Sequence, residues 1–481
     1  MPRSLSLSLL LASLAFALSA SAAAPARPNV LFIAIDDLRP ALGCYGDPQV
    51  KTPHIDRLAA QGLMLNRAYC QVPVCGASRA SLMTGILPLP NRFTTHLSRA
   101  DEDAPSAATL PQVFREAGYT TLSNGKLFHN SADTKERSWS EGTWASGLGH
   151  AASLDPTTTA SKSAAGRSRI YEAPDVPDDA YGDGQLAVKT IADLGRLKAA
   201  GKPFFLACGF IRPHLPFYAP KKYWDLYDRE KIVLAENRRR PADAPAGLKA
   251  SAEYRSYAHG DYQDGTDAFH RMMRHGYYAS TSYVDKLVGD VLAELTRLGL
   301  AENTIVVIWG DHGWNLGEHD FWGKHNTLDT AVRVPLIVKV PGRTSGQKSD
   351  ALVGVYDLFP TLCALAGLPV PATVQGRSFA ALLANPQQKF RDSVYTRFGK
   401  GDAVVTDRLI YTSYGTDGEM LYDLNADPAE NQNLAAKAAQ QKDLAAMRAL
   451  LATHQKTAAA AKVPAPRPSP KKKAAAEGTE K

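Results

Sequence analysis

Short apolar runs recur along the chain and predict buried strands. Residues 29–35 (NVLFIAI) are almost continuously apolar, as expected for a strand that is covered on both faces. Similar runs occupy 204–210 (FFLACGF), 304–309 (TIVVIW) and 335–340 (PLIVKV), and a further strand is expected from Thr120 (TTLSNGK). Their length and their isolation by turn residues favour strands over buried helices.

Helical segments lie between these runs. Thr52-Pro53 and Thr109-Leu110-Pro111 are typical helix starts, with threonine as the N-cap and proline in the first turn. Gly62 and Gly118 end these two helices. Apolar residues at helical spacing predict one face of a longer helix: Tyr283, Leu287, Val291, Leu295 and Leu298. The alternation predicts an α/β fold with a large, mostly parallel sheet and helices on both sides.

Chemically reactive side chains come directly after four of the predicted strands. In chain order they are Asp36 and Asp37, Lys126 and His129, Arg212 and His214, and Asp311 and His312. A lone histidine or an Asp-Asp pair is usually structural. However, the carboxyl ends of parallel strands share one edge of a sheet, and ligands bind there. The joint placement therefore predicts one site at that edge.

The residue types at this edge indicate a metal facing an anion. Asp36, Asp37 and Asp311 supply hard oxygen ligands, which suit Ca²⁺, and less well Mg²⁺, in preference to a soft metal. Such crowded carboxylates would repel one another without a cation. Four donors would surround a compact anion: Lys126, His129, His214 and Lys324. This combination is suited to hydrolysing a sulfate or phosphate ester, but it lacks an obvious nucleophile.

The segment 73–85 (PVCGASRASLMTG) carries an unusual cysteine. A thiol beside a hard cation is unexpected, because thiolates prefer soft metals. The stretch Cys75-Gly76-Ala77-Ser78-Arg79, followed by Leu82-Met83-Thr84-Gly85, resembles the sulfatase signature Cys-x-Pro/Ala-x-Arg with its trailing Leu/Met-Thr-Gly. In that family of formylglycine-dependent type I sulfatases, a dedicated enzyme oxidises the cysteine to Cα-formylglycine. The hydrated aldehyde is both a hard ligand and a nucleophile.

The resemblance extends from Arg27 to about Leu434 and is strongest to the iduronate-2-sulfatase branch. Stretches that carry it include IDDLRPALGCYGD, NGKLFH, RPHLPF, DHGWNLGEHDFWGKHN and LYDLNADPAENQNL. It implies an alkaline-phosphatase-like catalytic domain over residues 27–385. A smaller α+β subdomain with a short antiparallel sheet is expected over residues 386–455. The partners implied are a sulfated sugar substrate and a formylglycine-generating or anaerobic sulfatase-maturing enzyme.

The resemblance also assigns roles to individual residues. The metal Ca²⁺ would be held by Asp36, Asp37, Asp311, His312 and the modified Cys75. Arg79 would stabilise the formylglycine. The sulfate would be bound by Lys126, His129, His214 and Lys324, with one histidine protonating the leaving oxygen. A diol oxygen of residue 75 would attack sulfur, and the second hydroxyl would later expel sulfate, which is covalent catalysis.

Substrate recognition is expected near the C-terminal subdomain. Arg397 and Lys400 follow the predicted strand SVYTRF, and Arg could grip the carboxylate of a sulfated uronic acid. His325 would form the opposite wall. Position 77 is Ala where Pro is commoner, and position 86 is Ile where many relatives have Arg. These departures, with those at 87–92 and in His325-Asn326, flank the expected sulfate pocket and concern the sugar rather than the reaction.

The ends of the chain differ in composition from the rest. Residues 1–24 read as a signal peptide, because Arg3 precedes an apolar run that is short for a bilayer span and is followed by Ala20-Ser21-Ala22. This predicts export to the periplasm or the exterior without stable membrane insertion. The Ala/Pro/Lys tail 456–481 carries five of the seven net positive charges and is expected to be disordered. The remaining chain is nearly neutral, so a nucleic-acid surface is not indicated.

Five cysteines, an odd number, leave at least one outside any internal disulfide. Cys208 and Cys363 lie in apolar runs and are expected in the core. Two alternatives to a sulfatase remain open on sequence alone. A phosphatase or phosphonate hydrolase of the same superfamily would share the fold and the metal edge. A non-catalytic binding protein would result if Cys75 were never oxidised.

Overall fold

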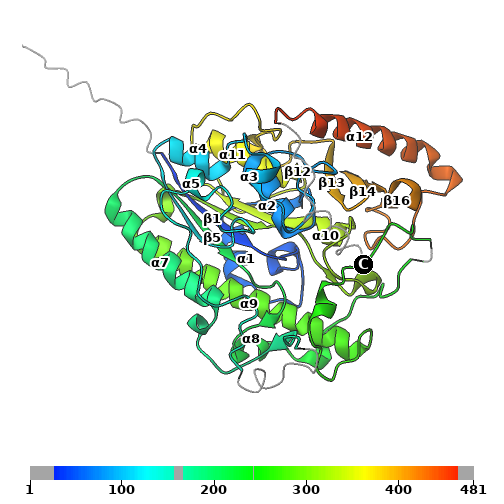
Figure 1. The fold of residues 1–481 in the computed structure, drawn as a ribbon, viewed down its shortest axis with the longest axis horizontal. Helices are drawn as coiled ribbons and strands as arrows, with labels where there is room; N and C mark the ends of the chain where they lie inside the picture. Colours follow the sequence, from blue (N-terminus) through cyan, green and yellow to red (C-terminus); the bar gives the residue numbers. More distant parts are fainter. Residues whose placement is uncertain (1–26, 156–165, 242, 464–481) are drawn as a thin grey trace, which may run out of the picture.

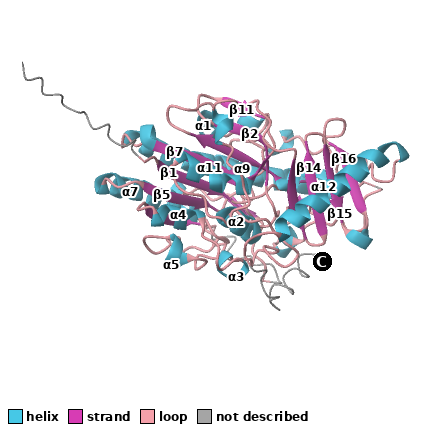
Figure 2. Cartoon of the chain, turned by 90° about the horizontal axis from the view of Figure 1, so that it is seen from above, coloured by secondary structure: helices cyan, strands magenta, loops and turns pink. Residues whose placement is uncertain are grey.

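A large mixed sheet forms the centre of the molecule in the computed structural model, which describes residues 27–155, 166–241 and 243–463 (Figures 1 and 2). Its strands follow the order β11-β2-β10-β7-β1-β5-β3, and β12 pairs with β2 beside this path. The strands are β1 (Asn29–Ile35), β2 (Leu63–Tyr69), β3 (Thr120–Gly125), β5 (Phe204–Phe210), β7 (Thr304–Gly310), β10 (Arg333–Lys339), β11 (Gln347–Ser349) and β12 (Val353–Gly354).

Four adjacent strands, β3, β5, β1 and β7, are parallel. In the register, Val30 lies beside Phe205 on one side and Ile305 on the other. Strand β10 is antiparallel to both β7 and β2. The prediction of a mostly parallel sheet is confirmed, and the reversed β10 is a feature that the apolar pattern did not reveal. The carboxyl ends of β1, β3, β5 and β7 therefore share one edge.

Helices cover both faces of the sheet, as the apolar runs predicted (Figure 1). Along β1, Phe32 packs into a core with α2 (Cys75–Thr84), α4 (Leu110–Glu116) and α11 (Leu358–Leu365). Its neighbour Ile33 points to the opposite face and packs with α1 (Pro53–Ala59), α7 (Gly182–Ala200) and α9 (Asp267–Arg297). Alternate residues of a strand face opposite sides, so a continuous apolar run is what this two-sided burial requires.

The two predicted helix starts are capped in different ways. The Thr109 hydroxyl accepts a hydrogen bond from the backbone N–H of Gln112, and the Gln112 side chain accepts from the N–H of Thr109, which forms a capping box at α4. Thr52 makes no such bond at α1. The carboxylate of Asp285, from α9, instead accepts from the N–H groups of His54 and Ile55. Tertiary packing thus supplies the cap there.

The C-terminal region forms a separate four-stranded antiparallel sheet, as expected (Figure 2). It contains β13 (Ser393–Phe398), β14 (Gly401–Thr406), β15 (Leu409–Ser413) and β16 (Glu419–Asp423), with α12 (Gln441–Ala459) packed against it. Because α12 continues to Ala459 and buries Ala458, the expected disordered tail does not begin at residue 456. The rest of that tail from residue 464, and the predicted signal peptide, lie outside the described residues.

Besides 3-10 turns, the described chain contains short helices and strand pairs. They are α3 (Ala100–Asp103), α5 (Lys135–Ser138), α8 (Lys221–Trp224), α10 (Asp329–Val332) and the paired strands β4 (Tyr171–Glu172) with β6 (Phe217–Tyr218) and β8 (Asn315–Leu316) with β9 (Trp322–Gly323). All five cysteines are free thiols, and Cys208 and Cys363 are buried as predicted. Within the described part of the chain, no helix combines the length and apolar character needed to cross a membrane.

Candidate active site

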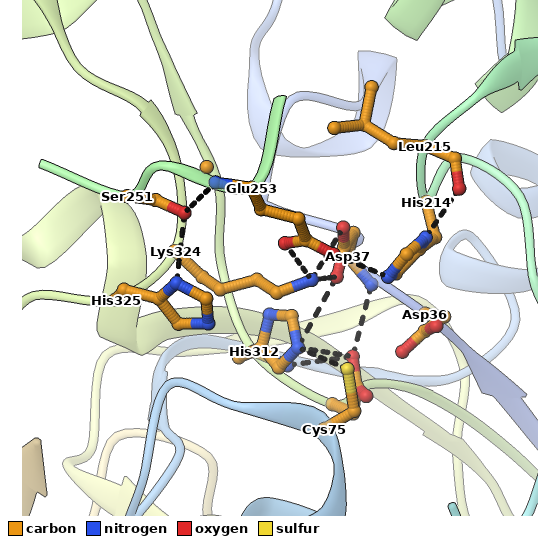
Figure 3. Close-up of polar contacts among 12 residues, drawn as sticks. Asp36, Asp37, Cys75, His214, Leu215, Ser251, Glu253, His312, Lys324 and His325 are labelled. Carbon is orange, nitrogen blue, oxygen red and sulfur yellow. Dashed lines mark hydrogen bonds and ion pairs between the residues drawn. The ribbon is translucent and has the colours of Figure 1, made fainter. Parts of the chain in front are cut away.

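Two strand ends and one helix start converge at the carboxyl edge of the sheet (Figure 3). Asp36 and Asp37 follow β1, Asp311 and His312 follow the adjacent β7, and Cys75 begins α2. Potential ligand atoms lie within 4.8 Å of one another in the group Asp36, Cys75, Asp311 and His312, and likewise in the group Asp36, Asp37, Cys75 and His214. The structure thus brings together every residue predicted for the metal.

The Cys75 thiol is buried at the N-terminus of α2. Its Sγ lies 3.4 Å from Nε2 of His312. Burial alone would raise the pKa of this thiol, but the charges of Lys126, Lys324 and His312 outweigh burial and hold the pKa well below its usual value. The helix N-terminus adds to this preference for negative charge. The surroundings of position 75 therefore favour negative charge on this side chain.

Arg79 lies one helical turn after Cys75, on the same side of α2. Its guanidinium is fully buried and donates to Oδ1 of Asp36 at 3.1 Å and to Oδ2 of Asp311 at 2.9 Å. It also donates to the backbone carbonyl of Leu127. The spacing of four residues between the cysteine and the arginine is therefore what places the arginine under the two carboxylates while the thiol faces them.

The three carboxylates at this edge are fully buried and differ in protonation preference. Burial opposes ionisation of Asp36, yet Lys126 and Arg79 hold its pKa well below its usual range. Burial raises the pKa of Asp37, and it raises the pKa of Asp311 to about 7. Asp37 and Asp311 thus ionise less readily than Asp36, and a hard divalent cation bound by the three groups would favour their ionised form.

Asp37 has a left-handed backbone, with φ at 58°, a conformation that costs a non-glycine residue about 1–3 kcal/mol. Its N–H donates to Oδ1 of Asp311, and its carbonyl accepts from the Tyr277 hydroxyl. Its carboxylate accepts from Nζ of Lys324 at 3.0 and 3.1 Å. This backbone turn lets two consecutive aspartates reach the same site, although neighbours on a strand point to opposite faces.

The four predicted anion-binding residues line one pocket of about 710 Å³ above Cys75. Lys126 pairs with Asp36 at 2.5 Å, and Lys324 pairs with Asp37. His214 contacts the carbonyl of Leu215 through Nδ1, and although burial disfavours its charged form, Asp37 and Glu253 hold its pKa well above its usual value. His129 has a buried Nδ1 with no hydrogen-bond partner among the described residues. These are donors grouped around a space of ligand size.

Several residues of this pocket were not predicted. They are His96, Trp144, His150, Glu253 and Tyr257. None follows a predicted strand or belongs to a quoted motif, because they come from long connections between the main elements. The ring of His96 lies 5.8 Å from that of His129, and the ring of His150 lies 5.9 Å from that of His214. A histidine isolated between elements carries no sequence signal for this role.

The three residues expected to recognise the sugar are separated in the structure. His325 lines the large pocket and also a smaller adjoining pocket that includes Lys400. Its ring stacks on Phe398 at 5.2 Å, and its Nδ1 lies 2.8 Å from the Ser251 hydroxyl. Burial lowers the pKa of His325 to about 3, so the ring is neutral at physiological pH. It can offer a hydrogen bond to a sugar but no charge.

The expectation for Arg397 is corrected by the structure. Its side chain is only 4% exposed and lines neither of these two pockets. The guanidinium donates to Asp402 at 2.9 Å and to the carbonyls of Leu89 and Gly399. These partners lie in the same hairpin or pack directly against it. Arg397 therefore holds the β13–β14 hairpin in place. It was expected to bind the carboxylate of a substrate, but it binds the carboxylate of Asp402 instead.

Comparisons with known proteins agree with this geometry. The sequence profile described as Sulfatase matches residues 28–368, and that of N-sulphoglucosamine sulphohydrolase, C-terminal, matches residues 317–457. Iduronate 2-sulfatase of Mus musculus is 36% identical over 436 residues, which cover 81% of this chain and 78% of the mouse protein. The residues that hold the candidate site lie within the matched region.

Solved structures of similar fold include enzymes of two activities. A 2-O GAG sulfatase superposes with a TM-score of 0.72 at 26% identity, covering 91% of this chain and 95% of its own. The phosphonate monoester hydrolase of Agrobacterium radiobacter has a TM-score of 0.74 at 24% identity, covering 92% and 100%. The fold and the site thus define an alkaline-phosphatase-like hydrolase. Within that class, the chain belongs to the sulfatase family and is a sulfuric ester hydrolase.

Replacing Arg397 should test the corrected role. Arg397→Ala removes charge-assisted hydrogen bonds to a partly buried carboxylate and two carbonyls, so we expect the free energy of unfolding to fall by about 2 kcal/mol. The KM for a sulfated uronate should stay near the wild-type value. Denaturant unfolding and steady-state kinetics measure the two effects.

The matched control is Lys400→Ala, whose ion pair with Asp417 is at the surface and is worth at most about 1 kcal/mol. If Arg397→Ala leaves the free energy of unfolding unchanged and raises the KM for the uronate, Arg397 binds the substrate carboxylate, as the sequence suggested.

Proposed function

We propose that this sulfatase hydrolyses sulfate esters of a uronic-acid-containing polysaccharide or oligosaccharide, using a formylglycine made from Cys75 and one bound Ca²⁺. The observation that carries the proposal is the position of Cys75 at the start of α2. There its side chain faces buried carboxylates on one side and a pocket lined by lysines and histidines on the other. An unmodified thiol has no evident purpose beside oxygen ligands.

The metal would be held by Asp36, Asp37, Asp311, His312 and residue 75. Buried carboxylates favour a hard cation, and the irregular oxygen-rich set suits Ca²⁺ better than Mg²⁺, which requires near-octahedral geometry. When bound, the cation would withdraw charge from the sulfuryl oxygens and favour the ionised form of its ligands. Arg79 remains beneath the site, where its pairs with Asp36 and Asp311 keep both carboxylates oriented.

Residue 75 would supply the nucleophilic oxygen as hydrated formylglycine. This requires a sulfatase-maturing enzyme as a partner, one that accepts Ala at position 77. The surroundings that lower the pKa of the thiol, above all Lys126 and Lys324, would equally stabilise an alkoxide at this position. The helix N-terminus acts in the same direction. A nucleophile at residue 75 is therefore activated by its position.

The remaining pocket residues would bind and protonate the substrate. Lys126 and Lys324 donate to the sulfuryl oxygens and stabilise the charge that develops on them. His214 is held in its charged form by Asp37 and Glu253, so it is the better placed of the histidines to give a proton to the leaving sugar oxygen. His129, with its unpartnered Nδ1, can donate to the sulfate or later accept a proton.

Relatives and pocket size together support the proposed substrate class. The mouse relative is named for iduronate and one structural neighbour for 2-O GAG sulfatase activity. A pocket of about 710 Å³ lined by Trp144 and Tyr257 accommodates a sugar as well as its sulfate. Residues 1–24 would direct the enzyme to the periplasm or the exterior, where such polymers are met. The phosphonate hydrolase neighbour supports a phosphoester or phosphonate substrate as the alternative.

The nucleophile is tested by Cys75→Ala, which should abolish sulfate-ester hydrolysis while the circular dichroism spectrum stays close to wild type. Cys75→Ser should be nearly as inactive where the host modifies only cysteine. Peptide mass spectrometry of wild-type residue 75 should show the aldehyde mass. Full activity of Cys75→Ala would exclude this chemistry, and an unmodified thiol in inactive protein would favour a binding protein.

The metal is tested without turnover. Asp311→Asn removes a carboxylate ligand, and chelation removes the ion, so each should lower the melting temperature by several degrees. The reason is that a ligand present at 100 times its Kd stabilises the folded state by about 2.7 kcal/mol. Asp350→Asn, an exposed carboxylate outside the site, is the control. If elemental analysis of active enzyme finds no divalent ion, the metal proposal fails.

A further inference from the structure

Glu253 places a negative charge inside the anion-binding pocket. It begins the short 3-10 turn Glu253–Ser256 and lines the large pocket beside the catalytic lysine and histidine. Oε2 lies 2.9 Å from Nζ of Lys324, and Oε1 lies 3.2 Å from Nε2 of His214 (Figure 3). The side chain is 24% exposed, so it faces the space that the substrate would enter.

The position of Glu253 is fixed by its neighbours. Its backbone N–H donates to the hydroxyl of Ser251, a buried residue that also contacts Nδ1 of His325. Burial opposes ionisation of this carboxyl, but Lys324 and His214 hold its pKa well below its usual range. Glu253 is therefore a charged group anchored in the wall of the pocket.

Such a carboxylate opposes anion binding, because it repels the ligand and occupies the same cations. The repulsion grows with the ligand charge. A sulfate monoester carries one negative charge. A phosphate monoester above pH 7 carries close to two, since its second pKa is about 6, and inorganic sulfate released by the reaction also carries two. A fixed negative charge thus penalises both dianions more strongly than the substrate.

We propose that Glu253 selects by the charge of the group bound between Lys324 and His214, so that this position accepts the singly charged sulfuryl group of an ester and rejects doubly charged groups, both the phosphoryl group of a phosphate monoester and the inorganic sulfate product. The inference rests on the proposed function, because it takes Lys324 and His214 as sulfate-binding groups. It assigns to Glu253 both specificity against phosphate esters and faster release of product.

The distances on which this depends are short. The Lys324 ammonium group contacts both Glu253 and Asp37. It is therefore the one group that lies between the Glu253 carboxylate and the carboxylate of Asp37, a proposed metal ligand. The Lys324 side chain is 2% exposed and that of Glu253 is 24% exposed, and buried or partly buried charges are screened much less than exposed ones. A ligand bound by Lys324 and His214 would lie within several ångströms of the Glu253 carboxylate. At the effective dielectric of a protein pocket, one additional negative charge on a ligand at such a distance weakens its binding by at least tenfold.

The test compares Glu253→Gln with the charge-conserving Glu253→Asp. Three substrates separate charge from chemistry at pH 8: 4-nitrophenyl sulfate and 4-nitrophenyl phenylphosphonate are monoanions, and 4-nitrophenyl phosphate is a dianion. In Glu253→Gln, kcat/KM for the phosphate relative to the sulfate should rise at least tenfold. The phosphonate-to-sulfate ratio should stay within about twofold. Glu253→Asp should keep both ratios near wild type, as should Asp264→Asn, which removes a more distant carboxylate near the same turn.

Product inhibition gives a second, independent measure. The inhibition constant of inorganic sulfate should fall at least tenfold in Glu253→Gln and remain near wild type in Glu253→Asp. Ratios are used because a general loss of activity, from any disturbance of Lys324 or His214, cancels in them. Unchanged ratios together with an unchanged inhibition constant in Glu253→Gln would overturn the proposal. So would an equal rise for phosphate and phosphonate.

A binding experiment separates this inference from the proposed function. In the Cys75→Ala background, calorimetry measures the Kd of 4-nitrophenyl phosphate and 4-nitrophenyl sulfate without turnover. Adding Glu253→Gln should strengthen phosphate binding relative to sulfate binding at least tenfold. If wild-type protein hydrolyses no sulfate ester, the proposed function fails, while this binding series still decides the role of Glu253. An unchanged ratio of the two Kd values rejects charge selection.

Discussion

Burying three carboxylates at one edge of a sheet is the constraint on which the rest of the site depends. Asp36, Asp37 and Asp311 have no contact with solvent, and buried charges are tolerated only when they are paired. Arg79 forms ion pairs with Asp36 and Asp311. On the pocket side, Lys126 pairs with Asp36 and Lys324 pairs with Asp37. The cations are thus held where a substrate anion would arrive, so the groups that stabilise the fold also form the anion site.

Helix α2 connects this charge balance to Cys75. Because Cys75 and Arg79 are one turn apart, a shift of the helix that moved the thiol would also break the arginine pairs. Gly76 allows the helix to start where it does, since a Cβ at that position would lie 2.1 Å from the carbonyl oxygen of His96. The motif that resembles the sulfatase signature is therefore also a packing requirement, because the same residues set the start of α2 and the pairing of Arg79 with the carboxylates.

The parts of the site that could be predicted are those that regular structure positions. Strand ends were recognisable from apolar runs, so Asp36, Asp311 and His214 were found together with their common edge. Glu253 and Trp144 could not be found in this way, because they belong to long connections whose path depends on packing against the finished sheet. Arg397 was misassigned because sequence shows a cation near a strand end and does not show that Asp402, five residues later, already neutralises it.

The sequence by itself determined the α/β class, the strands whose carboxyl ends meet at the site, and the cysteine motif. These depend on local periodicity and residue type, which any short window of the chain carries. Tertiary structure alone decided that β10 runs antiparallel, that α12 extends past residue 456, that Asp285 caps α1, and that a carboxylate shares the pocket with Lys324. Each of these depends on contacts between distant segments, and the free energy of such contacts exists only once the chain has folded.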